Sequence, residues 1–234
     1  MTSSTSPTTS PATYGLLGLL ATRSWTGYEL TQQVQRSLRF TWPTSEGHLY
    51  REQKRLVTLG WATATTERVG RRSRKRYTIT DEGREALRAW LETEPEEPHF
   101  QIEGLLRVFF ADRGTPEQLV AAMLATGDMA GSMVDELRGF VDEYLADGGP
   151  LWMLEQGVGG PQGERLEFRG RPMYPERLHV VALAIDLLTR LLSTLDEFLA
   201  EAAEEAGRWP TTTHTSLTPA TRRRLEAVRE RTSE

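Results

Sequence analysis

The stretch Thr44–Ile79 constrains this chain more than any other, because it joins a helical pattern to a strongly basic hairpin. Leu49 and Leu56 mark one face of a helix that Ser45 can cap and that Gly60 can end. A Thr-rich strand follows, then a glycine turn, then a second alternating strand. Six of the nine residues from Arg68 to Arg76 are basic. A helix followed by a cationic hairpin is suited to holding a phosphate backbone.

The patterns on either side complete a recognisable order of elements. An apolar run from Tyr14 predicts a buried first helix, and Thr26 to Glu29 form a capping box that begins a second helix. After the hairpin, Thr80 can cap a further helix. Three helices, a two-stranded hairpin and a helix are the order of a winged helix-turn-helix. We therefore expect a mainly α-helical fold with a two-stranded wing.

Basic and acidic residues are unevenly divided along the chain. Residues 1–90 carry 14 Lys and Arg against 7 Asp and Glu, whereas residues 91–234 carry 14 against 26. The net charges of the two parts are therefore +7 and −12, within a total of −5. A basic front part and an acidic back part indicate a polyanion-binding module joined to a solvated partner or regulatory module.

In a winged helix, the helix that Ser45 caps would enter the major groove of double-stranded DNA, and the wing would follow the phosphates. The residues predicted to contact DNA are polar or aromatic side chains of these elements and of the preceding helix: Tyr28, Ser45, His48, Tyr50, Arg51, Lys54, Arg55, Arg68, Arg71, Arg72, Arg74, Lys75 and Arg76. Tyr50 adjoins the inward Leu49, so a packing role is equally open. Glu52 is assigned to the outward face.

A run of basic residues is more often a solvated surface than a binding site. Here the run lies at a predicted hairpin directly after a helix-turn-helix pattern, which favours nucleic acid. A second interpretation is a helical oligomerisation or adaptor protein whose basic hairpin binds another protein. The salt dependence of duplex binding would separate the two, because phosphate contacts release counterions.

Beyond an acidic joint at 92–98 the pattern is helical, and one seam is sharply periodic. Its apolar residues are spaced alternately by three and four: Leu178, Val181, Ile185, Leu188, Leu192, Leu195 and Leu199. Such spacing predicts coiled-coil-like packing against a partner helix, which can lie in the same subunit or in a second copy of the chain. A twofold dimer would place two recognition helices about one DNA turn, ~34 Å, apart on a pseudo-palindromic site.

The remaining segments are less regular. Residues 147–176 are rich in Gly and Pro but contain apolar residues that could line an effector pocket or simply pin the loop: Trp152, Met153, Phe168, Met173 and Tyr174. We expect a disordered arm at 1–12, a DNA-binding domain at 13–92, a helical dimerisation and effector domain at 93–206, and a flexible tail at 207–234. Within that tail, Pro219–Arg231 can form a short helix.

Several classes of protein are disfavoured. The chain has no cysteine, and its four histidines (48, 99, 179 and 214) form no metal-binding pair, so we expect no cofactor, metal or catalytic site. Acidic pairs such as Asp135-Glu136 fit solvated helix faces. No apolar run approaches the ~20 residues of a membrane span, and the first residues lack a secretory signal. We expect a cytoplasmic protein, associated with the nucleoid through DNA.

The motifs together resemble a known family. The segments LLGLLATRSWTGYEL, SEGHLYREQKRLVTLGW and RKRYTITDEGREAL look like the N-terminal domain of the PadR family of transcriptional regulators, over about residues 14–91. The segment EGLLRVFFADRGTPEQL is more loosely similar to the helical C-terminal domain of the longer, virulence-activator-like subfamily.

The resemblance implies a homodimeric DNA-binding regulator, most often a repressor, that a small-molecule effector can release. It also implies that the C-terminal helices form the dimer. This chain departs from the family on the DNA-reading surface, where His48 and Arg51 stand in place of the common Thr and Pro. The operator sequence therefore does not carry over.

Overall fold

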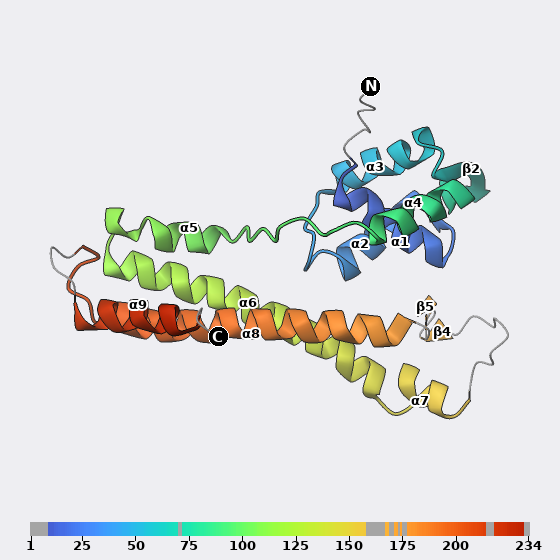
Figure 1. Cartoon of the computed structure of the whole chain (residues 1–234). Helices are drawn as coiled ribbons and strands as arrows, with labels where there is room; N and C mark the ends of the chain where they lie inside the picture. Colours follow the sequence, from blue (N-terminus) through green and yellow to red (C-terminus); the bar gives the residue numbers. More distant parts are fainter. Residues whose placement is uncertain are drawn as a thin grey trace, which may run out of the picture. The chain divides into compact units, whose positions relative to one another are not determined.

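The computed structural model describes residues 9–69, 72–157, 167–168, 171–172, 174, 177–213 and 218–231 (Figure 1). The chain divides into two compact units, Met1–Pro98 and His99–Glu234. The first holds the helix-turn-helix pattern and the second holds the long helices.

The first unit is a winged helix-turn-helix, as the order of motifs predicted. Its elements are α1 (Pro11–Thr22), β1 (Trp25–Thr26), α2 (Gly27–Ser37), α3 (Glu46–Thr58), β2 (Ala62–Val69), β3 (Arg72–Ile79) and α4 (Asp81–Leu91). The strands form an antiparallel sheet in the order β1-β3-β2. β2 and β3 are the wing, and the short β1 pairs with the base of β3.

Local capping chemistry fixes where these helices begin. The Thr26 hydroxyl accepts a hydrogen bond from the Glu29 amide, and the Glu29 carboxylate accepts one from the Thr26 amide at 2.8 Å. Ser45 caps α3 and Thr80 caps α4 in the same way. Gly60 ends the helical region with φ of +74°, a left-handed conformation that glycine adopts without strain. Each of these features was predicted from the sequence.

The core of the first unit gathers the inward faces of its three leading helices. Leu16, Leu17, Leu30, Leu49 and Leu56 are fully or almost fully buried there. Trp25 and Tyr77, which face each other in the β1–β3 pairing, close the core beneath the wing. The core therefore holds α3 and the base of the wing in one body.

The second unit is built on two long helices that pack against each other. Its elements are α5 (Glu103–Phe109), a 3₁₀ turn (Ala111–Arg113), α6 (Pro116–Leu145), α7 (Pro150–Glu155), β4 (Glu167–Phe168), β5 (Arg171–Pro172), α8 (Leu178–Ala206) and α9 (Pro219–Arg231). α6 and α8 run antiparallel (Figure 1). Their contact buries a cluster that includes Leu119, Met123, Leu199 and Ala203.

The segment 207–234 differs in part from the flexible tail that we expected. Trp209 packs against the α6–α8 cluster, because an indole is too apolar to leave in water beside an available apolar surface. The helix predicted at Pro219–Arg231 is present as α9, and Arg224 of this helix pairs with Glu205 of α8. Residues 147–176 also contain elements that the broken pattern did not predict, namely α7 and the β4–β5 pairing.

Candidate nucleic-acid interface

The outward face of α3 carries several of the residues predicted to contact DNA. Arg51 and Lys54 are exposed, as is Tyr50 to a lesser degree. His48 lies one turn from the helix start and is half-buried. Ser45 has a structural role as the cap, because its hydroxyl accepts a hydrogen bond from the His48 amide at 3.3 Å.

The placement of Glu52 corrects our assignment of this residue to the outward face. Glu52 is 6% exposed and the adjacent Gln53 is fully buried. Leu49, Glu52, Gln53 and Leu56 follow the spacing i, i+3, i+4, i+7 of a helix face that turns to the core. The charge of Glu52 suggested an outward position, but the spacing from the two leucines already favoured the inward one.

The wing presents a second set of basic side chains. Arg68, Arg74 and Lys75 are exposed on the two strands of the hairpin. Arg72 begins β3 opposite Val69, and Arg71 lies outside the described residues. Tyr28, at the start of α2, is 67% exposed. The wing and the outward face of α3 thus offer cationic and aromatic groups that can reach a phosphate backbone and base edges.

Arg76 differs from the other basic residues of the wing, because carboxylates hold its guanidinium. Its Nε donates to Glu67 Oε1 at 2.6 Å, and one terminal nitrogen lies 3.9 Å from Glu29 Oε2. The same guanidinium donates to the carbonyl oxygen of Ser24 at 3.3 Å. These contacts tie the wing to the start of α2, and we assign Arg76 a bracing role instead of a phosphate contact.

The neighbouring opposite charges of Arg76 and Glu29 are reflected in the pKa of each group. The hydrogen bond to Glu67 raises the pKa of Arg76 above its ordinary value. Burial acts to raise the pKa of Glu29, but the hydrogen bonds from Thr26 and the charges of Arg76 and Arg23 outweigh it, so the pKa of Glu29 is lowered. Both residues are therefore ionised at neutral pH.

The periodic seam of α8 lies partly against α6 of the same chain. Leu199 is 1% exposed and Leu195 packs on the same cluster, together with Leu119 and Met123 of α6. Toward the start of α8 the seam is less covered: Leu178, Ile185, Leu188 and Leu192 are half-buried, and Val181 is 36% exposed. One end of the predicted dimer seam is therefore core within a single chain.

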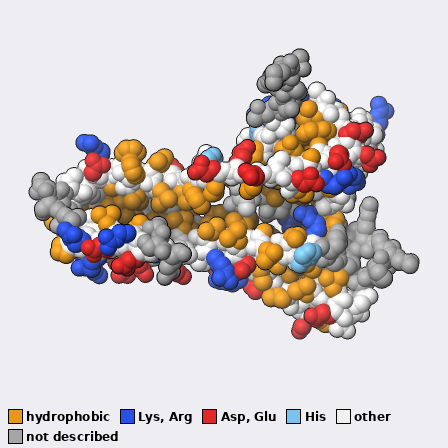
Figure 2. All heavy atoms as spheres, viewed as in Figure 1, with side chains coloured by type: hydrophobic (Ala, Val, Ile, Leu, Met, Phe, Trp, Pro, Cys, Tyr) orange, Lys and Arg blue, Asp and Glu red, His pale blue; other side chains and the backbone are white. Residues whose placement is uncertain are grey.

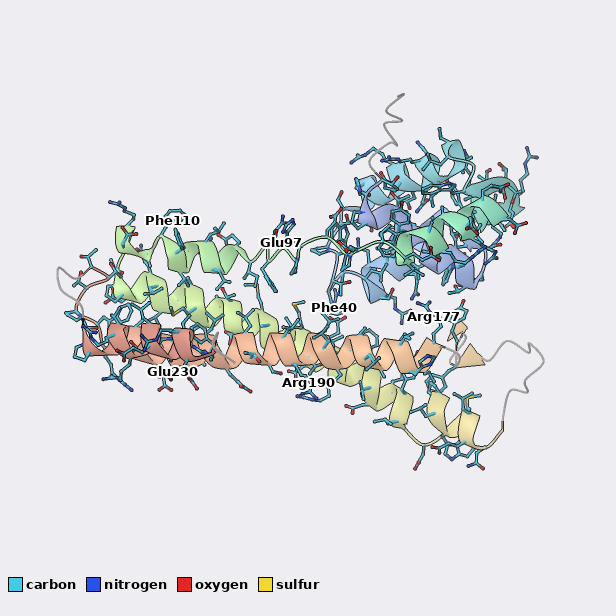
Figure 3. The ribbon with its side chains drawn as sticks, in the orientation of Figure 1. Phe40, Glu97, Phe110, Arg177, Arg190 and Glu230 are labelled. Atoms are coloured by element: carbon cyan, nitrogen blue, oxygen red, sulfur yellow. The ribbon has the colours of Figure 1, made fainter. Side chains whose placement is uncertain are left out.

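A different stripe of α8 is apolar and open. Val180, Leu183, Leu187 and Leu191 are 49%, 70%, 59% and 49% exposed. Figure 2 shows hydrophobic side chains gathered on the surface of this unit. α8 also has the length and apolar composition of a membrane span, although a single such helix is weak evidence for one. An ion pair between Asp186 and Arg190, at 3.0 Å, interrupts its surface, and Arg190 extends away from the helix (Figure 3).

The residues predicted to line an effector pocket are scattered over short elements. Trp152 and Met153 belong to α7, Phe168 belongs to β4, and Met173 lies outside the described residues. The Tyr174 hydroxyl is buried without a hydrogen-bond partner among the described residues. A groove of about 680 Å³ lies elsewhere, between α5 and α6, and none of these residues lines it.

Residues 16–89 match the model of the transcriptional regulator PadR-like family. The first unit is a PadR-like domain. The winged helix, its caps and its basic wing all fall within the matched segment or at its edges. Among the residues that the structure describes, no group of three or more His, Asp or Glu side chains could hold a metal ion.

Two relatives share part of this sequence. The negative transcriptional regulator PadR of Bacillus subtilis is 25% identical over 140 residues, which are 59% of this chain and 77% of that protein. The probable transcriptional regulator Rv1176c of Mycobacterium tuberculosis is 33% identical over 86 residues, which are 36% of this chain and 45% of that protein.

Solved structures extend the likeness beyond the PadR-like domain. Bacillus subtilis PadR in complex with operator DNA matches with a TM-score of 0.62 at 19% identity, over 83% of this chain and 98% of that one. The virulence activator AphA of Vibrio cholerae matches with a TM-score of 0.58 at 18% identity, over 84% and 98%. These matches establish the fold of both units, including the long C-terminal helices.

Proposed function

We propose that this chain is a sequence-specific, double-stranded-DNA-binding transcriptional regulator that acts as a homodimeric repressor on a pseudo-palindromic operator. The observation that carries the proposal is the pairing of two exposed cationic surfaces, on α3 and on the wing, within a PadR-like domain. A regulator of this kind works in the cytoplasm, on the nucleoid, and needs no catalytic site.

The two surfaces have different tasks. α3 enters the major groove, where Arg51 and Lys54 can reach guanine edges or phosphates and His48 lies near the helix start. The wing follows the backbone through Arg68, Arg74 and Lys75, which supply affinity without reading sequence. Two domains read a longer site than one, so the distance between them contributes to specificity.

Dimerisation is the second part of the proposal. The open stripe of α8, centred on Leu187, is the surface that we assign to the second copy, in place of the buried end of the predicted seam. A contiguous exposed apolar surface on a protein that works in water needs a partner. A dimer interface also accounts for the apolar composition of α8, so a membrane is not needed to explain it.

Release by a small molecule is the third part. Bacillus subtilis PadR has been solved both with operator DNA and with p-coumaric acid, with TM-scores of 0.62 and 0.59 to this chain. That pair supports the proposal that a regulator of this fold responds to a small effector. Here the candidate regions are the segment around Trp152 and Tyr174 and the groove between α5 and α6.

Selection from a random duplex library would test the proposal directly. The purified full chain should enrich a sequence with twofold pseudo-symmetry and half-sites about one turn apart. Arg51→Ala should relax the preference at one position of each half-site, and an equal loss on all sequences would make Arg51 a phosphate contact. Failure to enrich any sequence, together with salt-independent binding, would favour the adaptor interpretation.

A further inference from the structure

The inward face of α3 is unusual because two of its four central positions are polar. Between Leu49 and Leu56, Glu52 and Gln53 are 6% and 0% exposed. An inward helix face normally carries apolar residues at such positions. The two polar side chains therefore need a reason that packing alone does not provide.

Each polar side chain is bonded to a different neighbouring helix. Glu52 accepts a hydrogen bond from the hydroxyl of Thr13, which is itself fully buried on α1. The Gln53 Nε2 donates to the carbonyl oxygen of Gly27 and to the Thr31 hydroxyl, both at 3.0 Å, on α2. α3 is thus bonded through adjacent residues to both helices that support it.

The bonds of Gln53 come at a cost in stability. Its Oε1 is buried with no hydrogen-bond partner among the described residues, and it lies so close to Gly27 that a Cβ there would be 2.8 Å away. An unpaired buried acceptor destabilises a fold. The Thr31 hydroxyl also donates to the Gly27 carbonyl at 3.0 Å, so neither partner depends on Gln53 for satisfaction. A leucine at this position would leave no polar group unpaired.

Unlike the leucines beside them, Gln53 and Glu52 make directional contacts. Apolar contacts are non-directional, whereas a hydrogen bond weakens steeply when it is misaligned, so the bonds of Glu52 and Gln53 constrain the rotation of α3 more sharply than the leucines do. A helix with its side chains is about 10–12 Å wide, so a rotation of about 20° moves an outward side-chain tip by roughly 2 Å. That displacement is enough to break a hydrogen bond to a base edge.

We propose that Glu52 and Gln53 are positioning residues that fix the rotation of α3 and so set its discrimination between DNA sequences, Gln53 at the expense of stability. The inference rests on the proposed function, because it concerns how α3 presents Arg51 and Lys54. It assigns specificity to residues that touch no DNA.

Gln53→Leu tests the proposal in the full chain, with Gln33→Leu on α2 as the matched control. Binding would be measured on the duplex that the wild-type protein selects and on a scrambled duplex of equal composition. We expect the variant to lose about tenfold in affinity for the selected duplex and nothing on the scrambled one. Its melting temperature should equal or exceed that of the wild type.

Two further measurements keep the outcome clear. Thr31→Val removes one partner of Gln53, and its effect on discrimination should vanish in the Gln53→Leu background. If Gln53→Leu does not fold, Gln53→Met replaces it with an unbranched side chain of similar length. A wild-type protein with no preference for any duplex would refute the proposed function. If the wild type is specific but the Gln53 variants discriminate between the duplexes as well as it does, this inference alone is refuted. The same holds if the variants lose affinity equally on both duplexes.

Discussion

Arg74→Ala tests whether the wing holds a phosphate backbone. Arg74 is exposed on β3, opposite Glu67 in the hairpin register. Each phosphate that a protein neutralises on duplex DNA releases counterions, and it contributes about 0.9 to the slope of log affinity against log salt. A dimer presents this arginine twice. We therefore expect the variant to lower the magnitude of the slope by about 1.8.

The size of this effect is convenient to measure. Between about 50 and 200 mM salt, a slope difference of about 1.8 corresponds to a roughly twelvefold difference in affinity. The wild type should thus lose roughly twelvefold more affinity than the variant over that range. Fluorescence anisotropy with a labelled duplex would give the slopes of both proteins.

Arg76→Ala is the matched control, because it removes the same charge two residues along the same strand. Its guanidinium is held by Glu67 at 2.6 Å and lies near Glu29, so we expect the slope to stay close to that of the wild type. An unchanged slope for Arg74→Ala would remove that residue from the DNA contacts. Equal changes for both variants would show a general effect of charge.

Two further predictions concern the dimer and the brace. Leu187→Glu places a charge on a residue that is 59% exposed, so it should leave the fold intact but give monomers in sedimentation velocity. The control variant Leu91→Glu, at a residue 69% exposed in the first unit, should remain dimeric. Wild-type dimerisation of the Leu187 variant would move the interface elsewhere. Glu29 has a lowered pKa in the folded protein, so its contribution to stability is present above the ordinary value of 4.5 and is lost as the pH falls through the lowered value. The midpoint of urea unfolding should therefore fall more steeply with acidification in the wild type than in Glu29→Gln, which keeps the cap but cannot titrate. Parallel curves of midpoint against pH for the two proteins would contradict this prediction.

The features that the sequence predicted well are those with local causes. Thr26, Ser45 and Thr80 begin helices because their hydroxyls reach amides three residues ahead, and Gly60 ends one because it tolerates a positive φ. These interactions involve neighbours in the chain, so they can be read without a structure. Together with the order of elements they determine the winged helix.

The features that the sequence did not reveal depend on distant partners. Glu52 was assigned outward by its charge, because nothing local indicates that Thr13, 39 residues away, would donate to it. Arg76 was grouped with the other basic residues of the wing. The hairpin register does not separate it, since Arg74 lies directly opposite Glu67 and Arg76, opposite Thr65, lies on the same face. Its contact with Glu29 of α2 needed the tertiary fold.

The apolar surface of α8 limits what the dimer can be. The seam of α8 is partly covered by α6, so the open stripe from Val180 to Leu191 needs a different partner. Burying what remains exposed of its four large side chains yields roughly 1 kcal/mol each, so two copies yield about 8 kcal/mol. Association costs about 4–15 kcal/mol in lost freedom, so this stripe alone falls short of a stable dimer over most of that range.

Further apolar surface must therefore join the interface, and the end of α5 offers two large exposed rings. Phe109 and Phe110, at its end, are 78% and 59% exposed, and their rings meet edge to face (Figure 3 labels Phe110). We expect Phe109→Ala to raise the dissociation constant of the dimer without lowering the melting temperature of the monomer, because the ring packs on little within its own chain. Sedimentation equilibrium would measure the change. Dimers of wild-type affinity would show that the additional surface lies outside the end of α5.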